Sequence, residues 1–215
     1  MLFSLTVNSQ SIDWDNFNSH IADSVLFVEM NKFRNGLGLP SYVYSQGMHD
    51  NISVYSTGEM VKATDVFHPS LKDVVKKYMP SIKEEVMNTL NINPYDPNMF
   101  SPGEVSLSHT PNGWGITPYK TYTELAKGII KQWCLSKPHY DIITLEATGQ
   151  NRNFHYIGVG SCSVQMGYKS VRGTDLIFPT VYASFQIGRF HLHNGQLRNQ
   201  HHIPHQSFLI FDMVT

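Results

Sequence analysis

The sequence predicts a mixed domain of helices and strands, either an α+β fold or an α/β/α sandwich. Apolar residues recur at helical spacing before about residue 138, and strand-like segments follow from about residue 156. Helices and strands therefore do not alternate as they do in βαβ proteins. The chain has 215 residues, of which 41% are hydrophobic, and this is enough for one domain with a sizeable core.

The first helix is predicted over residues 20–35. Before it, residues 1–19 alternate weakly between apolar and polar side chains, which indicates an arm or an edge strand. Glycines and Pro40 follow the helix and should end it. Its apolar stripe consists of Leu26, Met30, Phe33 and Leu37.

Further helices are predicted between residues 44 and 90. Residues 44–66 indicate one long helix. Two short helices should follow, the first ending at Pro80 and the second beginning with a capping box of Ser81 and Glu84. Residues 91–119 are rich in proline and asparagine, and we expect a long loop there that is functional or wraps a partner.

The last helix and the strands complete the pattern. Thr121 and Glu124 form a second capping box, which opens an amphipathic helix that should end near Pro138. Residues 156–164 and 181–187 are strand-like.

A β extension is expected at the end of the chain. Residues 189–193 and 196–200 flank an Asn-Gly pair, which is the preferred turn of a two-residue hairpin. Residues 207–214 then predict a final apolar strand.

Charge and composition exclude several classes of function. Only 15% of the residues are charged and the net charge is −1, so no basic patch is present to bind nucleic acid. No segment approaches the ~20 apolar residues of a membrane span, and the N-terminus lacks the pattern of a secretory signal. We therefore expect the virion or the cytoplasm as the location. The two cysteines, Cys134 and Cys162, are interpreted as buried free thiols.

Three segments of the sequence, residues 28–40, 124–139 and 156–160, occur in an order that is typical of one family. Together they resemble the CAP superfamily of cysteine-rich secretory, antigen 5 and pathogenesis-related proteins, especially its bacterial SCP-like branch. Residues 28–40, VEMNKFRNGLGLP, resemble its opening helix with the pattern N..R...GL..L. Residues 124–139, ELAKGIIKQWCLSKPH, resemble the helix that ends W..SPGH. Residues 156–160, YIGVG, resemble EIGVG at the start of a core strand, and residues 182–188 match the strand that follows it.

The resemblance implies a three-layer α/β/α sandwich with a cleft. It covers about residues 20–190, which we take as a CAP-like domain. Residues 1–19 then form the arm or edge strand, and residues 191–215 form the His-rich β extension.

The cleft of that family carries two histidines and two acids, and in some members the histidines bind zinc. The resemblance places the histidines at His109 and His139. Its GEN[IL] pattern falls on residues 113–116, which puts Trp114 at the first acid position. The second acid position falls on Ser136, so both acids are expected to be missing. Tyr140 replaces the arginine that commonly follows the second histidine.

Two pairs of histidines are thus candidate metal ligands. Two imidazoles can start a zinc site, but zinc needs three or four ligands. His191 and His193 form an H-x-H pair that would lie on one face of a strand, and we expect zinc, if any, at one of these pairs. The alternative for both is an ordinary polar role.

Catalysis receives little support from the residues. A Ser-His acyl-transfer site would need an orienting acid and an oxyanion hole, and neither is visible. We therefore assign no catalytic residue and lean against an enzyme. Trp114, Ser136 and Tyr140 are instead candidates for contact with a ligand in the cleft.

Three functions remain open. The first is a non-enzymatic structural or interaction module, such as a phage tail, neck or baseplate component. It would bind protein partners or copies of itself through the 91–119 loop and residues 190–215. The second is a metal-binding cleft protein acting as a hydrolase or as a binder of lipids or other small ligands. The third is an effector exported without a signal peptide.

Overall fold

The computed structural model describes residues 10–90, 103–109, 119–144, 154–170 and 177–193. The elements before residue 91 are α1 (Ser19–Gly36), β1 (Val43–Tyr44), α2 (Gln46–Met48), the π-helical turn η1 (His49–Ser53), α3 (Val54–Ala63) and α4 (Lys72–Leu90). The later elements are β2 (Gly103–His109), α5 (Tyr122–Cys134), α6 (Lys137–Thr144), β3 (Phe154–Ser170) and β4 (Ile177–His193).

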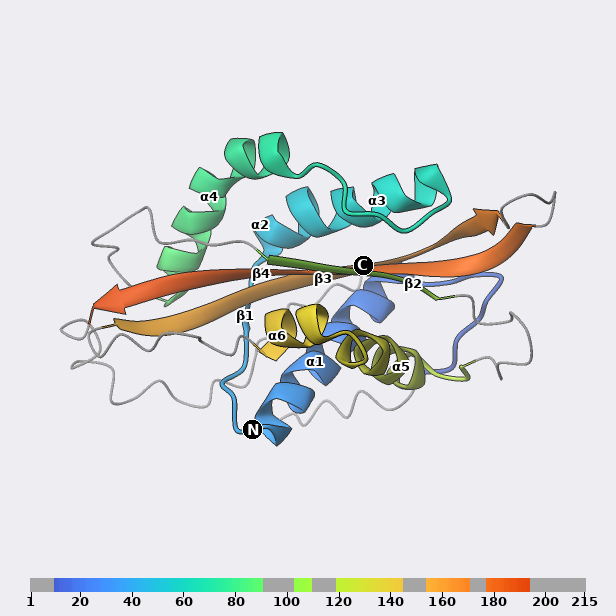
Figure 1. The fold of residues 1–215 in the computed structure, drawn as a ribbon, viewed down its shortest axis with the longest axis horizontal. Helices are drawn as coiled ribbons and strands as arrows, with labels where there is room; N and C mark the ends of the chain where they lie inside the picture. Colours follow the sequence, from blue (N-terminus) through green and yellow to red (C-terminus); the bar gives the residue numbers. More distant parts are fainter. Residues whose placement is uncertain (1–9, 91–102, 110–118, 145–153, 171–176, 194–215) are drawn as a thin grey trace.

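A sheet of four strands in the order β1-β3-β4-β2 forms the middle layer of the described part. Only β1 runs parallel to its neighbour, and the other pairs are antiparallel. Figure 1 shows α2, α3 and α4 on one face of the sheet and α1, α5 and α6 on the other. The predicted α/β class and its three layers are therefore confirmed.

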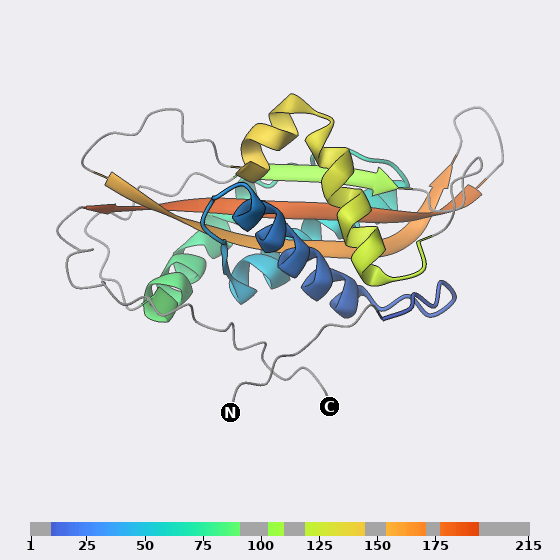
Figure 2. The ribbon, with the colours of Figure 1, turned by 90° about the horizontal axis from the view of Figure 1, so that it is seen from below.

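An apolar interface joins the sheet to α1 and α5, which cross it side by side (Figure 2). Leu26 and Met30 of the predicted stripe of α1 are fully buried here, and Phe33 is partly buried against the same core. Leu37, the last residue of that stripe, lies beyond the helix and is exposed. Thr121 caps α5 as predicted, because its Oγ1 accepts from the Glu124 amide at 3.2 Å, but the Glu124 carboxylate accepts from the amide of Lys120 and not from that of Thr121. Trp133 is completely buried beside Phe185 of β4.

The opposite interface, between α3 and the sheet, is rich in hydroxyl groups. The hydroxyls of Ser53 and Ser161 lie 2.7 Å apart, and Thr57 Oγ1 donates to Ser163 Oγ at 2.8 Å. Ser184 Oγ donates to the carbonyl of Ser53 at 3.3 Å. Because Ser53 belongs to η1 and Thr57 to α3, these hydrogen bonds join η1 and α3 to β3, and η1 to β4, where an apolar contact would be usual.

The prediction of two short helices around Pro80 was wrong, because α4 runs through the proline. Ser81 does not cap a new helix; its hydroxyl donates to the carbonyl of Tyr78 at 2.8 Å. The apolar stripe explains the continuity, since Ile82 and Val86 are buried in the same cluster as residues that precede the proline.

The strands differ from the prediction in extent. Residues 103–109 form β2 inside the segment that was predicted to be a loop, and they pair with β4. The predicted strands 156–164 and 181–187 are confirmed, but β3 and β4 each extend to 17 residues. Residues 189–193 pair with β3, whereas the predicted turn and the strands after it lie outside the described residues.

Candidate functional site

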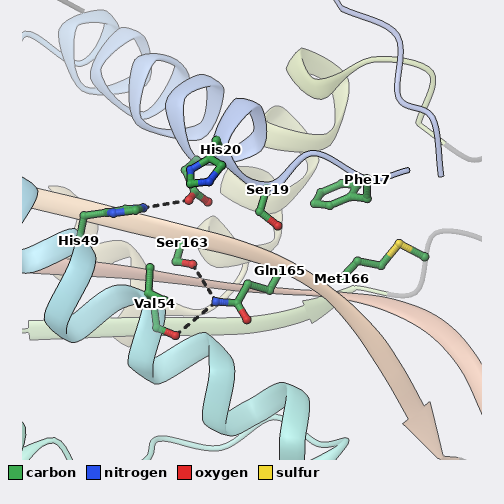
Figure 3. A pocket seen from close by; sticks show the side chains of 9 residues that line it. Phe17, Ser19, His20, His49, Val54, Ser163, Gln165 and Met166 are labelled. Carbon is green, nitrogen blue, oxygen red and sulfur yellow. Dashed lines mark hydrogen bonds and ion pairs between the residues drawn. The ribbon is translucent and has the colours of Figure 1, made fainter. Parts of the chain in front are cut away.

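A pocket of about 360 Å³ opens between the first turn of α1, the start of α3 and strand β3 (Figure 3). This volume lies within the range of ~300–1,000 Å³ that is usual for small-molecule sites. Polar and apolar side chains from four elements, α1, η1, α3 and β3, and from the segment before α1 share its wall. They are Phe17, Ser19, His20, Asp23, His49, Val54, Ser163, Gln165 and Met166.

His49 is held between two carboxylates. Its Nε2 lies 2.9 Å from Asp23 Oδ2, and its Nδ1 lies 2.8 Å from Asp50 Oδ1. Ionised carboxylates only accept hydrogen bonds, so each ring nitrogen donates a proton when both acids are ionised. Burial acts to lower the pKa of His49, but its hydrogen bonds to Asp23 and Asp50 and their charges raise this pKa above the ordinary value. The two carboxylates therefore favour the protonated ring.

Asp23 occupies the buried end of this network on α1. Strand β1 pairs with β3 only at Val159 and Gly160, so the edge of β3 is open further along. Asp23 Oδ1 accepts from the Val164 amide at that edge. Burial raises the pKa of Asp23, and the hydrogen bond from His49 only partly offsets this effect.

The π-helical turn η1 carries His49. Its position is set by Glu85 of α4, whose carboxylate accepts from the amides of Gln46 and Gly47 at 2.8 and 2.9 Å. This carboxylate also lies at the start of α2, where the helix dipole favours a negative charge. Ser45 caps α2, the helical turn that precedes η1, by accepting from the Met48 amide. Single π-helical turns occur frequently at functional sites.

Ser163 and Gln165 belong to the hydrogen bonds of the hydroxyl-rich interface. Ser163 Oγ accepts from Thr57, and Gln165 Nε2 lies 3.3 Å from the carbonyl of Val54 and 3.5 Å from Ser163 Oγ. Both nitrogens of His49 are engaged with carboxylates, so this ring has none left to take a proton from Ser163. His49 and Ser163 therefore do not form the nucleophile–base pair of an acyl-transfer site.

A second cluster brings together His68, between α3 and α4, and His139 on α6. Their ring centroids lie 6.5 Å apart, edge to face. Burial, and then the proximity of His68, lowers the pKa of His139 and so favours the neutral ring. The neutral imidazole is the form that binds metals.

The other predicted site residues have varied positions. His109 is the last residue of β2, where it pairs with Val181. Ser136 lies half-buried just before α6, and Tyr140 lies half-buried on that helix. His191 and His193 pair with Tyr156 and Phe154 near the end of the sheet, and Trp114 lies outside the described residues.

Sequence reasoning missed Asp23, His49 and His68. Asp23 and His49 are far apart in the chain and meet only through tertiary packing, so no local pattern marks them.

The described residues contain neither a cluster of three or more metal ligands nor a membrane-spanning helix. Among them, no cluster of three or more His, Cys, Asp or Glu could hold a metal ion. No helix in the same ranges has the length and apolar character needed to cross a membrane. The thiol of Cys162 is fully buried and that of Cys134 is half-buried, and both are free.

Comparison with known proteins identifies no family. No family model matches the chain, and no curated protein matches it. Among solved structures, it is similar to a cysteine-rich secretory protein from Staphylococcus aureus subsp. aureus Mu50, with 12% sequence identity and a TM-score of 0.38. The match covers 80% of this chain and 39% of the other chain. The CAP superfamily therefore remains a resemblance seen in the sequence.

Proposed function

We propose that this chain is a non-enzymatic interaction module built on a CAP-like fold. The single observation that supports the proposal is the position of His49, whose two ring nitrogens are both bonded to carboxylates in the pocket. A general base needs a nitrogen that can accept a proton from the reacting group. In this arrangement the ion network joins α1, η1 and β3, and the pocket around it is suited to binding.

A hydrolysis assay tests this proposal. We expect p-nitrophenyl acetate and p-nitrophenyl butyrate to be hydrolysed at the same low, non-saturating rate by the wild type, Ser163→Ala and His49→Gln. Circular dichroism establishes that the variants are folded. A saturable rate that is lost in either variant would show a working catalytic pair and overturn the proposal.

The partners of the module belong to the same proposal. We take them to be proteins or further copies of this chain, as in a phage tail, neck or baseplate. The low fraction of charged residues, 15%, supports this choice. Residues 91–119 and 190–215 are proposed as the docking segments, apart from β2 and the end of β4, which belong to the sheet. Light scattering on the chain that ends at His193 tests this, and unchanged assembly would contradict it.

A metal-binding cleft is the second candidate function. It is favoured by the proximity of His68 and His139 and by the lowered pKa of His139. We expect about one zinc per chain by mass spectrometry, lost in His68→Ala and in His139→Ala. The matched control is His20→Ala, which removes a histidine from the pocket beside α1. A further variant, His109→Ala, tests the ligand that the sequence predicted. Zinc that is absent, or is retained in both variants, would exclude this candidate.

A further inference from the structure

We propose that the pocket between α1, α3 and β3 binds a compact organic cation, an ammonium or guanidinium group attached to a short apolar chain. This inference rests on the proposed function as a binding module and names the chemistry of its ligand. It concerns Asp23 and its neighbours, a site separate from the pair of His68 and His139.

The charges around the pocket favour a cation. With both carboxylates ionised and the ring protonated, the network of Asp23, Asp50 and His49 carries one net negative charge. His20 also lines the pocket, and its charge acts on Asp23 in the same direction as that of His49 but has the smaller effect. Of the two carboxylates, Asp23 lines the pocket and has a side chain that is only 11% exposed. Its charge is therefore poorly screened by water, and a cation in the pocket would gain more from it than from a surface carboxylate.

Asp23 also has hydrogen-bonding capacity for a ligand. A carboxylate offers about four lone-pair sites. The bonds from His49 Nε2 and the Val164 amide use one site on each oxygen. The raised pKa of Asp23 shows that these two bonds do not fully compensate for its burial.

The rest of the pocket wall favours a ligand that has both an N–H donor and a short apolar chain. Gln165 directs its amide nitrogen to Val54 and Ser163, and its Oε1 is an acceptor suited to an N–H donor. Phe17 and Met166 provide an apolar surface at one end of the pocket, and Figure 3 shows both beside Ser19 and Gln165. An alkyl chain of a few carbons can pack there, and the ring of Phe17 can add a cation–π contact.

Titration of the full chain with matched probes tests the inference. The probes are n-butylammonium, n-butylguanidinium, n-butanol and butyrate, which share one alkyl chain and differ in charge. We expect both cations to shift the backbone amide resonances of Ser19, His20 and Gln165 saturably, with at least about tenfold tighter binding than n-butanol. Butyrate should not bind. Equal binding of the alcohol, or tighter binding of butyrate, would overturn the inference.

A pair of variants localises the cation. Ser19→Lys places a tethered ammonium in the pocket and should weaken n-butylammonium binding by about tenfold or more. The matched control, Ser24→Lys, adds the same charge at an exposed position of α1 and should leave binding unchanged. Equal affinities in the two variants would contradict the site, and their amide spectra show directly that both are folded.

The source of the cation is distinguished by one further probe. Nα-acetyl-lysine amide should bind at least as tightly as n-butylammonium if the natural ligand is a side chain of a protein partner, and more weakly if it is a free amine. The inference and the proposed function can fail separately. If the chain neither binds the cations nor hydrolyses the esters, the inference is overturned but the proposal of a non-enzymatic module still stands.

Discussion

The His49 network joins two carboxylates at different depths. The side chain of Asp23 is 11% exposed and that of Asp50 is 55% exposed. When the imidazolium loses a proton, one N–H remains for two carboxylates. It should stay with Asp23, since an unpaired carboxylate costs more when buried. Deprotonation therefore releases Asp50 first and leaves the link between α1 and η1 in place.

The stability of the fold should depend on this proton. The pKa of His49 is raised in the folded chain, so its contribution to the free energy of unfolding is complete below the unfolded value of ~6.5. That contribution is lost as the pH rises through the folded-state pKa. Each unit of difference between the two pKa values contributes about 1.4 kcal/mol. Urea unfolding from pH 5 to pH 9 should show decreasing stability at the alkaline end.

Two variants control for other titrating groups. In His49→Gln the decrease above pH 6.5 should disappear. In Asp50→Asn the pKa of the His49 ring, followed by NMR, should fall toward its ordinary value because one carboxylate is removed. An unchanged pKa in Asp50→Asn would show that Asp50 does not act on the ring.

At this scale the sequence predicted little of the site. Trp133 could be assigned to the core from its place in a helical stripe, and the structure confirms it. The pairing of Asp23 with His49 could not be predicted, because it depends on how closely α1 approaches η1 over the edge of β3. His139 was identified through a family pattern, while its neighbour His68 lies in a segment without a local pattern.

Among the elements, α4 carries a proline in its interior. Pro80 lacks the N–H that would bond to the preceding turn, and its ring crowds that turn. Helix α4 continues because both of its halves contribute to one apolar cluster with Met48 and Ile52. Burial of that shared face outweighs the local cost of the proline.

Replacement of Pro80 by alanine should therefore stabilise the protein. We expect Pro80→Ala to raise the free energy of unfolding by about 1–3 kcal/mol, because the missing hydrogen bond is restored. Urea denaturation measures the change, with the exposed Glu84→Ala in the same helix as a control that should stay within about 0.5 kcal/mol. An unchanged or lower stability of Pro80→Ala would show that the proline imposes no local cost.

Periodic elements were predictable and isolated ones were not. The stripes of α1 and α5 identify these helices because one face is buried along its whole length. Strand β2 was missed because it has only seven residues and is flanked on both sides by prolines and asparagines, which are typical of loops. Its identity as a strand comes from pairing with β4, which is a long-range contact.

Taken as a whole, the molecule has two unlike interfaces about one sheet. The interface with α1 and α5 is apolar, whereas the interface with η1 and α3 depends on paired hydroxyls such as Ser53 and Ser161. An apolar contact tolerates sliding, but a hydrogen bond between two buried hydroxyls fixes the position of one element on another. We therefore expect α3 to be held in register by its polar side chains.

A double-mutant cycle on Ser53 and Ser161 tests this view. Each single alanine variant leaves one buried hydroxyl without its partner and should cost about 1–3 kcal/mol. The double variant should cost less than the sum of the two single variants, because no orphaned hydroxyl remains. Chemical denaturation gives the three values. Strict additivity would show that the 2.7 Å contact between these hydroxyls contributes no coupling energy.

The long pairing of β3 with β4 has a consequence for the way in which the chain folds. The two strands are consecutive in the sequence, and each contributes 17 residues to a single antiparallel ladder. Contacts between nearby segments close small loops and form early, whereas β1 and β2 must find partners many residues away. The hairpin should therefore form first and serve as the template on which the earlier two thirds of the chain assembles. In synthesis from the N-terminus, that template is made only after the segments that assemble on it.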